Sequence, residues 1–254
     1  MEKSANIFRF KRFDVINERS AMKVNSEGVL LGALMTVLPS DRRLLDIGTG
    51  TGTIALMAAQ RLSDCAESMR QVRIDAIDID EPSATEAAEN FRNSPWNGCL
   101  YAYRTSLEDF ESENNVLSGP KEEFDLIFSN PPYFDNALNA PEQRRNAARH
   151  TSTGLSYREI LDFASSNLKD GGRVAMVLPA DTEHDLTRHA RMNGFHLNKI
   201  TRIRTVSRKA PKLIVAEFVK NRVEAPQDTV LTIQNEGQYT KEYLSLMKEF
   251  YLFA

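Results

Sequence analysis

The chain has 254 residues, 41% of them hydrophobic and 26% charged, which suits one globular domain with at most a small appendage. Two cysteines, Cys65 and Cys99, are too few for a disulfide framework, and no Cys/His cluster has the spacing of metal ligands. No apolar run approaches the roughly 18 residues of a membrane span and the N-terminus lacks the apolar middle of a signal peptide, so we expect a cytoplasmic protein with no metal and no membrane association.

The formal net charge of −3 is unevenly distributed along the chain. Residues 195–222 contain eight Lys or Arg and one Glu, and residues 1–23 are also basic, whereas residues 106–125 are acidic. A charged segment is often no more than a solvated face. Two basic segments on an otherwise acidic chain nevertheless favour a polyanionic partner.

The N-terminal stretch FRFKRFDVINERSAMKVNSEGVLLGAL (8–34) combines two patterns. Its first half interleaves aromatic and basic side chains, which are Phe8, Arg9, Phe10, Lys11, Arg12 and Phe13. This composition suits stacking on bases and contact with phosphates. An apolar helix is expected from about Ser26, and residues 1–40 would then form an extension and helix packed on the core.

After residue 41, apolar runs alternate with segments of helical period, which indicates a parallel sheet with helices on both faces. Strands are expected at 43–48, 72–78, 99–105, 124–129 and 173–179. Helices are expected at 52–62, from Pro82 to about Arg92, at 156–168, and from Asp181 or Thr182 to before Gly194. The polar segments 108–123 and 134–155 are expected to be loops.

Two further strands, 195–206 and 212–220, have no helix between them and should form an antiparallel hairpin at the end of the sheet. A short strand, VLTIQ, and an amphipathic helix over 240–250 complete the chain. We therefore predict an α/β fold with a mostly parallel, seven-stranded sheet in residues 41–222, with the C-terminal strand and helix of residues 223–254 in the same domain.

The motif DIGTGTG (46–52) lies where the first strand passes into its helix. Glycines at alternate positions allow a tight turn and close approach of a ligand. The spacing differs from the dinucleotide pattern G-x-G-x-x-G, and Asp46 would repel a pyrophosphate but suit a cationic ligand or an amino group. The second strand ends in Asp78, where such folds bind ribose hydroxyls, and Asp80 is better explained as the cap of the next helix.

Together these motifs resemble the cofactor site of class I S-adenosylmethionine-dependent methyltransferases, which have a Rossmann-like fold. A nicotinamide dinucleotide site is the competing interpretation. The resemblance implies S-adenosyl-L-methionine as the cofactor. The implied contacts are Gly48, Gly50 and Gly52 with the methionine end, Asp46 near its ammonium, Asp78 with the ribose hydroxyls, and Ser106 and Leu107 with the adenine ring.

The segment SNPPYF (129–134) follows the fourth strand at the edge where the glycine loop is expected. Pro131 and Pro132 lack an N–H and hold φ at about −65°, so the backbone presents carbonyl acceptors in fixed directions. Asn130 adds a side-chain acceptor, and two converging acceptors suit an amino group with two hydrogens. Tyr133 and Phe134 supply aromatic faces on which a planar ring can stack. A proline-rich turn is the alternative, but beside the glycine loop the motif favours methyl transfer to nitrogen.

This motif resembles that of amino methyltransferases acting on adenine N6, on glutamine amides of release factors and, with Phe for Tyr, on guanine N2 of ribosomal RNA. The chain as a whole closely resembles the bacterial tRNA1(Val) adenine-37 N6-methyltransferase family. The matching residues are Met22-Lys23-Val24, Gly28, Leu30-Leu31-Gly32-Ala33, DIGTGTG, NPPYF, Arg149-His150-Thr151 and the basic hairpin. The resemblance implies methylation of adenine N6 in a tRNA, beside the anticodon.

Three alternatives fit less well. Release-factor glutamine methyltransferases should carry a helical N-terminal domain of several dozen residues, and only about 40 residues precede the first strand. Adenine methyltransferases of restriction systems usually add a target-recognition domain, for which the chain has no room. In a non-enzymatic RNA-binding protein, neither the glycine motif nor the NPPY motif would have a function.

The same resemblance implies the remaining roles. The catalytic residues would be Asn130, Pro131, Pro132 and Tyr133. Lys23 would contact the cofactor or a phosphate, while Phe134, Arg149 and His150 would contact the RNA or order the NPPY loop. Phosphates of the tRNA would be bound by Arg202, Arg204, Arg208, Lys209 and Lys212.

Overall fold

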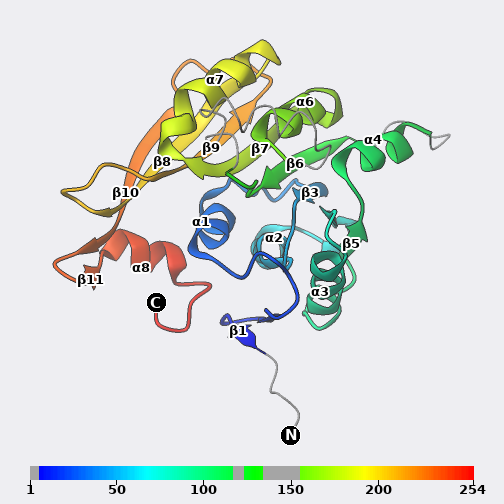
Figure 1. The fold of residues 1–254 in the computed structure, drawn as a ribbon, viewed down its shortest axis with the longest axis horizontal. Coiled ribbons are helices and arrows are strands. Elements are labelled where there is room, and N and C mark those ends of the chain that lie inside the picture. The colour runs from blue at the N-terminus through cyan, green and yellow to red at the C-terminus, as the bar shows by residue number, and fades with distance from the viewer. Residues whose placement is uncertain (1–5, 117–122, 134–154) are drawn as a thin grey trace, which may run out of the picture.

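In the part of the chain that the structure describes, residues 6–116, 123–133 and 155–254 of a computed structural model, nine strands form one sheet (Figure 1). The strands are β3 (Arg43–Ile47), β4 (Arg73–Asp78), β5 (Leu100–Arg104), β6 (Phe124–Ser129), β7 (Leu168–Pro179), β8 (His196–Val206), β9 (Leu213–Val219), β10 (Gln227–Asn235) and β11 (Gln238–Tyr239). Their order across the sheet is β11-β10-β8-β9-β7-β6-β3-β4-β5.

The expected parallel sheet with an antiparallel C-terminal hairpin is confirmed. β5, β4, β3, β6 and β7 run parallel, and β9 lies antiparallel between β7 and β8. The hairpin does not end the sheet, because β10 pairs in parallel with β8 and β11 pairs with β10. An uncovered β8 would present a long row of unpaired backbone groups, which β10 instead satisfies. The sheet is therefore wider than the seven strands predicted.

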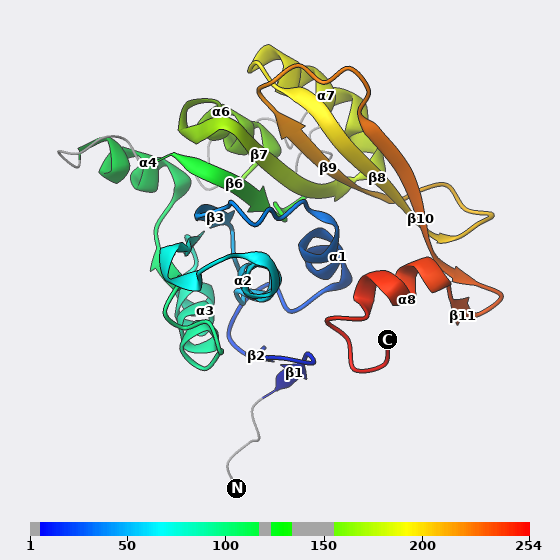
Figure 2. The same ribbon diagram turned by 180° about the vertical axis from the view of Figure 1, so that it is seen from behind.

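Helices cover both faces of the sheet, as expected. One face carries α1 (Ser26–Leu34), α2 (Thr53–Cys65), α3 (Glu81–Arg92) and α8 (Lys241–Met247); the other carries α4 (Leu107–Val116), α6 (Tyr157–Asn167) and α7 (Glu183–Met192) (Figure 2). Leu44 packs into the first hydrophobic layer and Leu45 into the second, so β3 is apolar on both sides.

The remaining elements are short. They are the antiparallel ribbon of β1 (Ile7–Arg9) and β2 (Asp14–Ile16) and the 3-10 turns η1 (Met69–Gln71) and η3 (Ala180–Thr182). No helix within the described ranges is long and apolar enough to cross a bilayer. Nor does a group of three or more His, Cys, Asp or Glu side chains with metal-binding geometry occur among those residues.

The prediction of a loop at 108–123 is wrong for its first half, where α4 forms. Ser106 begins this helix, because its hydroxyl oxygen accepts a hydrogen bond of 3.0 Å from the Asp109 backbone N–H. Phe110 then packs its ring 6.4 Å from the ring centroids of Phe124 and Phe163. Two acids of this run, Glu108 and Asp109, lie in the first turn of the helix, where negative charge is favoured. The other expected loop, 134–155, lies outside the described residues except for Leu155.

The proposed RNA-stacking role of the N-terminal aromatic residues is wrong for Phe10 and Phe13. These residues are only 4% and 6% exposed, and their rings stack on each other with centroids 4.5 Å apart. Phe13 also packs edge-on against Trp96. Arg12 forms an ion pair with Asp64. The aromatic residues of this segment thus extend the hydrophobic core, because the β1–β2 ribbon folds back on α2 and α3.

All five parallel strands end at one edge of the sheet. The glycine loop follows β3, Asp78 ends β4, Ser106 follows β5 and Asn130 follows β6. β8 runs in the same direction as β7, since two antiparallel pairings separate them, so the basic loop 207–212 also begins at this edge. Ligands of open α/β sheets bind at this carboxyl edge.

Candidate active site

The glycine loop has a backbone that only glycine adopts readily. Gly48, Gly50 and Gly52 have φ values of +71°, +57° and +80°. A Cβ atom on Gly52 would lie 2.5 Å from a ring carbon of Phe91, which is too close for any side chain. The loop is anchored by backbone N–H groups of Gly48 and Thr49, which both donate to the Ile77 carbonyl. The loop therefore presents backbone without side chains at its glycines to the edge of the sheet.

Asp78 holds the glycine loop and remains able to bind a ligand. One carboxylate oxygen accepts from the Gly50 N–H at 2.8 Å, and the other accepts from the Asp80 N–H at 2.9 Å. A carboxylate offers about four acceptor positions, so two stay available for ribose hydroxyls. Burial raises the pKa of Asp78. Asp80 caps α3 by accepting from the Ser83 N–H, as predicted.

Asp46 is fully buried at the end of β3. One of its carboxylate oxygens accepts a 2.7 Å hydrogen bond from the Thr49 hydroxyl, whereas the other has no hydrogen-bond partner among the described residues. Burial raises the pKa of Asp46 to about 7, against the opposing effect of the Thr49 hydroxyl. An unpartnered buried carboxylate oxygen beside the glycine loop suits a cationic ligand.

Asn130 and the glycine loop line the same pocket. The Ser129 hydroxyl donates to the Ile47 carbonyl at 2.6 Å, which ties the end of β6 to β3. Asn130 is 6% exposed, and its Oδ1 accepts from the Tyr133 hydroxyl at 3.3 Å. The residues lining the pocket are Met22, Lys23, Val24, Asn25, Gly28, Gly48, Thr49, Gly50, Thr51, Thr53, Ile54 and Asn130. The structure thus joins two motifs that lie about 80 residues apart in the sequence.

Comparison with known proteins decides the family. Residues 23–200 match the family described as the methyltransferase small domain. The tRNA1(Val) (adenine(37)-N6)-methyltransferase of Flavobacterium psychrophilum is 35% identical, with 97% of this chain and 99% of the relative aligned. The protein of the same name from Parabacteroides distasonis is 37% identical, with 96% and 97% aligned. The chain belongs to this methyltransferase family.

Solved structures agree on the fold of this methyltransferase. A predicted O-methyltransferase from Agrobacterium tumefaciens has a TM-score of 0.61 at 14% identity and covers 87% of this chain and 95% of its own. A putative class I S-adenosylmethionine-dependent methyltransferase from Listeria monocytogenes has a TM-score of 0.57 at 13% identity, covering 92% of this chain and 72% of its own. The fold is that of class I methyltransferases, and S-adenosyl-L-methionine is the cofactor.

The described residues fit this cofactor. Its ammonium would have the unpartnered oxygen of Asp46 as an acceptor, and its ribose hydroxyls the free acceptor positions of Asp78, and both contacts stay predictions. Ile79 follows Asp78 and is 73% exposed, which presents an apolar surface suited to one face of a flat ring. Ile79 was not predicted from the sequence, although an apolar residue between two acids at a strand end is a pattern that could have indicated it.

The other predicted cofactor contacts have structural partners of their own. Ser106 caps α4, and Leu107 is partly buried against the second hydrophobic layer, so contact of either with adenine stays a prediction. Lys23 lines the pocket and donates from Nζ to the Glu18 carbonyl at 2.5 Å. Phe134, Arg149 and His150 lie outside the described residues.

A second recess lies beside Tyr133 and was not predicted. It is lined by Pro132, Tyr133, Ser156, Tyr157, Leu178, Pro179 and Thr182. The end of β7 and the start of α6 supply most of these residues, and they carry no motif that marks them in the sequence. Burial raises the pKa of Tyr133, which keeps its phenol protonated and able to donate to Asn130.

The basic residues of the hairpin divide into two groups. Arg202 forms ion pairs with Glu183 and Asp228, and Arg204 donates to the Thr232 hydroxyl at 2.9 Å, so both side chains are engaged within the protein. Arg208, Lys209 and Lys212 are exposed in or beside the loop at the carboxyl edge of the sheet. The second group is better placed for phosphate contact.

The raised pKa of Asp46 predicts a pH-dependent cofactor affinity. Cation binding favours the ionised carboxylate, so the affinity for S-adenosylmethionine should rise with pH from about 5.5 to 7, by up to roughly tenfold per unit, and then level off. Titration calorimetry at several pH values would measure this. Asp46→Asn should flatten the profile, and a profile unchanged by that substitution would contradict the assignment.

The same pKa predicts the sign of a stability change. When an acid has a higher pKa in the folded than in the unfolded protein, its ionisation lowers the stability of the folded protein. Without cofactor, the contribution of Asp46 to stability should be greatest below its ordinary value of 3.8 and should decline as the pH rises to about 7.

Proposed function

We propose that the protein transfers a methyl group from S-adenosylmethionine to N6 of adenine in tRNA, at adenine 37 beside the anticodon of tRNA1(Val). The observation that carries the proposal is the position of Asn130, whose side chain shares one pocket with the glycine loop of the cofactor site. The relatives that align over nearly the full chain bear the name of this activity. The adenine would reach the site by unstacking from the anticodon loop.

The acceptor amino group is bound by oxygen atoms. Asn130 Oδ1 and the Pro131 carbonyl accept its two hydrogens, which increases the electron density on nitrogen and fixes its direction. Asn130 Oδ1 can do so while bonded to Tyr133, because an amide oxygen has two lone pairs. The bound cofactor supplies an activated methyl group on a sulfonium. The proton lost from nitrogen becomes acidic once the bond to carbon forms, so a strong base is unnecessary.

Tyr133 and the recess beside it would hold the ring of the base. The phenol contacts Asn130, so the aromatic ring lies next to the acceptor oxygen. Leu178 and Pro179 at the end of β7 add apolar surface on that side. A planar base stacked on Tyr133 would present its exocyclic nitrogen to Asn130.

The direct test is to incubate the protein with labelled S-adenosylmethionine and tRNA lacking the modification, then digest the RNA and identify the labelled nucleoside. We expect N6-methyladenosine from position 37. A parallel reaction with a release factor tests the glutamine alternative. Methylglutamine in that arm, or no N6-methyladenosine in the RNA arm, would reject the proposal.

The proposal extends to the location, the partners and the domain limits of the protein. We propose a cytoplasmic protein without an obligate protein partner, in which residues 1–40 form an N-terminal extension, residues 41–222 the methyltransferase domain, and residues 223–254 the completing strand and helix. The last of these segments joins the main sheet through β10.

Substitutions in the hairpin should separate phosphate contacts from structural ones. Arg208→Ala with Lys209→Ala should weaken tRNA binding and lower the slope of log affinity against log salt by about 1 to 2, since each lost phosphate contact removes somewhat less than one counterion. Filter binding at several salt concentrations measures the slope. Arg202→Ala should instead lower the melting temperature, because Glu183 and Asp228 lose their partner, and should leave the slope nearly unchanged. The reverse pattern would exchange the two roles.

A further inference from the structure

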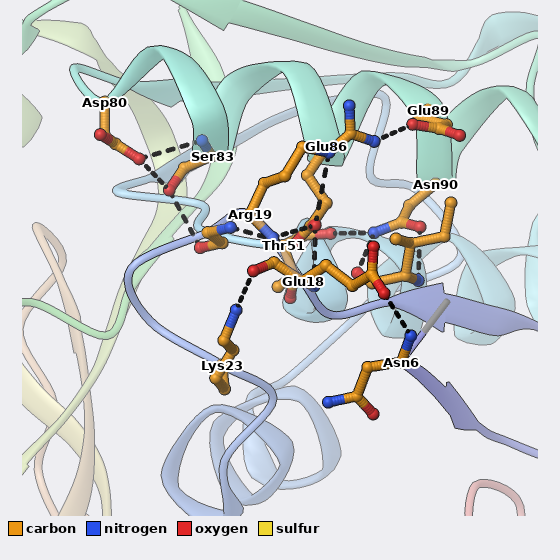
Figure 3. Close-up of polar contacts among 12 residues, drawn as sticks. Asn6, Glu18, Arg19, Lys23, Thr51, Asp80, Ser83, Glu86, Glu89 and Asn90 are labelled. Carbon is orange, nitrogen blue, oxygen red and sulfur yellow. Dashed lines mark hydrogen bonds and ion pairs between the residues drawn. The ribbon is translucent and has the colours of Figure 1, made fainter. Parts of the chain in front are cut away.

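Residues 17–25, here called the strap, connect β2 to α1 and pass across the carboxyl edge of the sheet. Figure 3 shows side chains of α3 pointing toward this segment. Asn90 donates to the Ile16 carbonyl at 3.0 Å and to the Thr51 carbonyl of the glycine loop at 2.9 Å. The entrance to the strap and the glycine loop are therefore held by one side chain.

Glu86 holds the first part of the strap. Its side chain is fully buried, and its two oxygens accept from three consecutive backbone N–H groups, those of Glu18, Arg19 and Ser20, at 2.9, 2.6 and 3.2 Å. The Arg19 guanidinium adds an ion pair at 3.8 Å. Burying a carboxylate is costly unless hydrogen bonds compensate, and an apolar residue would serve helix packing equally well. The geometry therefore indicates that Glu86 sets the path of the strap backbone.

The second part of the strap reaches the active site. The Ser20 hydroxyl donates to the Met22 carbonyl at 2.9 Å and also bonds to the Ser83 hydroxyl of α3. A Cβ atom placed on Gly50 would lie 3.6 Å from that same Met22 carbonyl. The Met22 sulfur lies 3.8 Å from Asn130 Nδ2. Met22 thus extends from the cofactor loop to the residue that binds the acceptor.

We propose that Glu86 is a positioning residue, which fixes the strap so that Met22 forms the wall of the site where cofactor and acceptor nitrogen meet. The proposal rests on the proposed function of Asn130 and deepens it. A thioether suits this wall because it is apolar, polarisable and adaptable in shape. Met22 is 41% exposed beside the pocket, so a bound cofactor and base would cover it and exclude water from the transfer.

The test compares substitutions at the two ends of this connection. Glu86→Gln keeps the shape of the side chain but removes the negative charge to which the three N–H groups donate. Met22→Ala removes the wall. Each should weaken binding of S-adenosylhomocysteine, measured by calorimetry, by about tenfold, and each should lower kcat on tRNA. Glu89→Gln, one turn further along α3, is the matched control because Glu89 contacts the exposed Arg19 side chain, and it should change neither quantity.

A double-mutant cycle distinguishes positioning from general stability. If Glu86 acts through Met22, the double variant should bind S-adenosylhomocysteine no more weakly than the weaker single variant. Met22→Leu should restore most of the affinity in the otherwise unchanged protein. Additive losses, or a Glu86→Gln variant with a lower melting temperature but unchanged binding and kcat, would overturn the proposal.

A second variant and a readout without RNA separate the role of the strap from folding and from methyl transfer. If Glu86→Gln does not fold, Ser20→Ala takes its place in the cycle, because it removes the bond to the Met22 carbonyl and leaves Glu86 in place. S-adenosylhomocysteine binding involves no RNA. Failure of the unmodified protein to methylate tRNA would reject the proposed function, whereas failure of the binding cycle would reject the role of the strap.

Discussion

Replacement of Asn130 by alanine is expected to lower the rate of methyl transfer by about 10²–10³-fold while leaving the affinity for S-adenosylhomocysteine within about threefold. The substitution removes an acceptor that is aligned before the reaction begins, and loss of one such aligned group commonly lowers kcat by about 10²–10³-fold. Asn130 directly follows β6, whose end is tied to β3 by the Ser129 hydroxyl, so the backbone around it should persist. Single-turnover rates on tRNA and calorimetry with the cofactor product would measure the two effects.

Asn130→Asp is the informative companion variant, because it keeps an oxygen acceptor at the same place. It should retain more activity than Asn130→Ala. A loss of cofactor binding equal to the loss of rate would mean that Asn130 belongs to the cofactor site, and our assignment of the two motifs would be wrong.

Asp78→Ala should raise the dissociation constant for S-adenosylmethionine by about 10²-fold. It removes the proposed ribose acceptor and leaves the Gly50 and Asp80 N–H groups without their partner. Hydrogen bonds to a charged group contribute about 1.5–3 kcal/mol each, so the loss of one or two explains an effect of this size. Calorimetry measures the affinity, and thermal unfolding should show a lower melting temperature.

The matched control is Asp80→Ala. Asp80 lies two residues away and caps α3 by accepting from the Ser83 N–H. Its loss should cost about 1 kcal/mol of stability, as for other N-caps, with little change in affinity. Equal loss of affinity in both variants would show that the whole loop, and not Asp78, determines binding.

Sequence patterns predicted the central elements well because these elements depend on interactions between residues that are close in the chain. The strand at 43–48 was expected and β3 spans Arg43–Ile47; the helix expected over 156–168 is α6, Tyr157–Asn167. α6 begins with a capping box of Ser156 and Glu159, which depends only on neighbours in the chain. The prediction of a loop at 108–123 was wrong because α4 depends on the packing of Phe110 against β6 and α6.

The N-terminal aromatic residues show that amino-acid composition alone does not predict which side chains are buried. Alternating Phe and basic residues are equally compatible with an RNA-binding surface and with an edge that folds onto the core. Phe10 and Phe13 are buried because Trp96 and Tyr251, far away in the sequence, supply the other side of the packing. Likewise, Arg202 was expected to bind phosphate, and its acidic partners come from α7 and β10.

By itself the sequence determined the kind of chemistry, because the glycine loop, Asp78 and Asn-Pro-Pro-Tyr are recognised from residues that are local to each motif. Only the tertiary structure decided which residues meet. Met22 and Asn130 are brought into contact, and Glu86 holds the strap, by the packing of distant segments on one edge of a sheet. Such contacts have no periodicity or spacing in the sequence, since they depend on the relative placement of elements after folding.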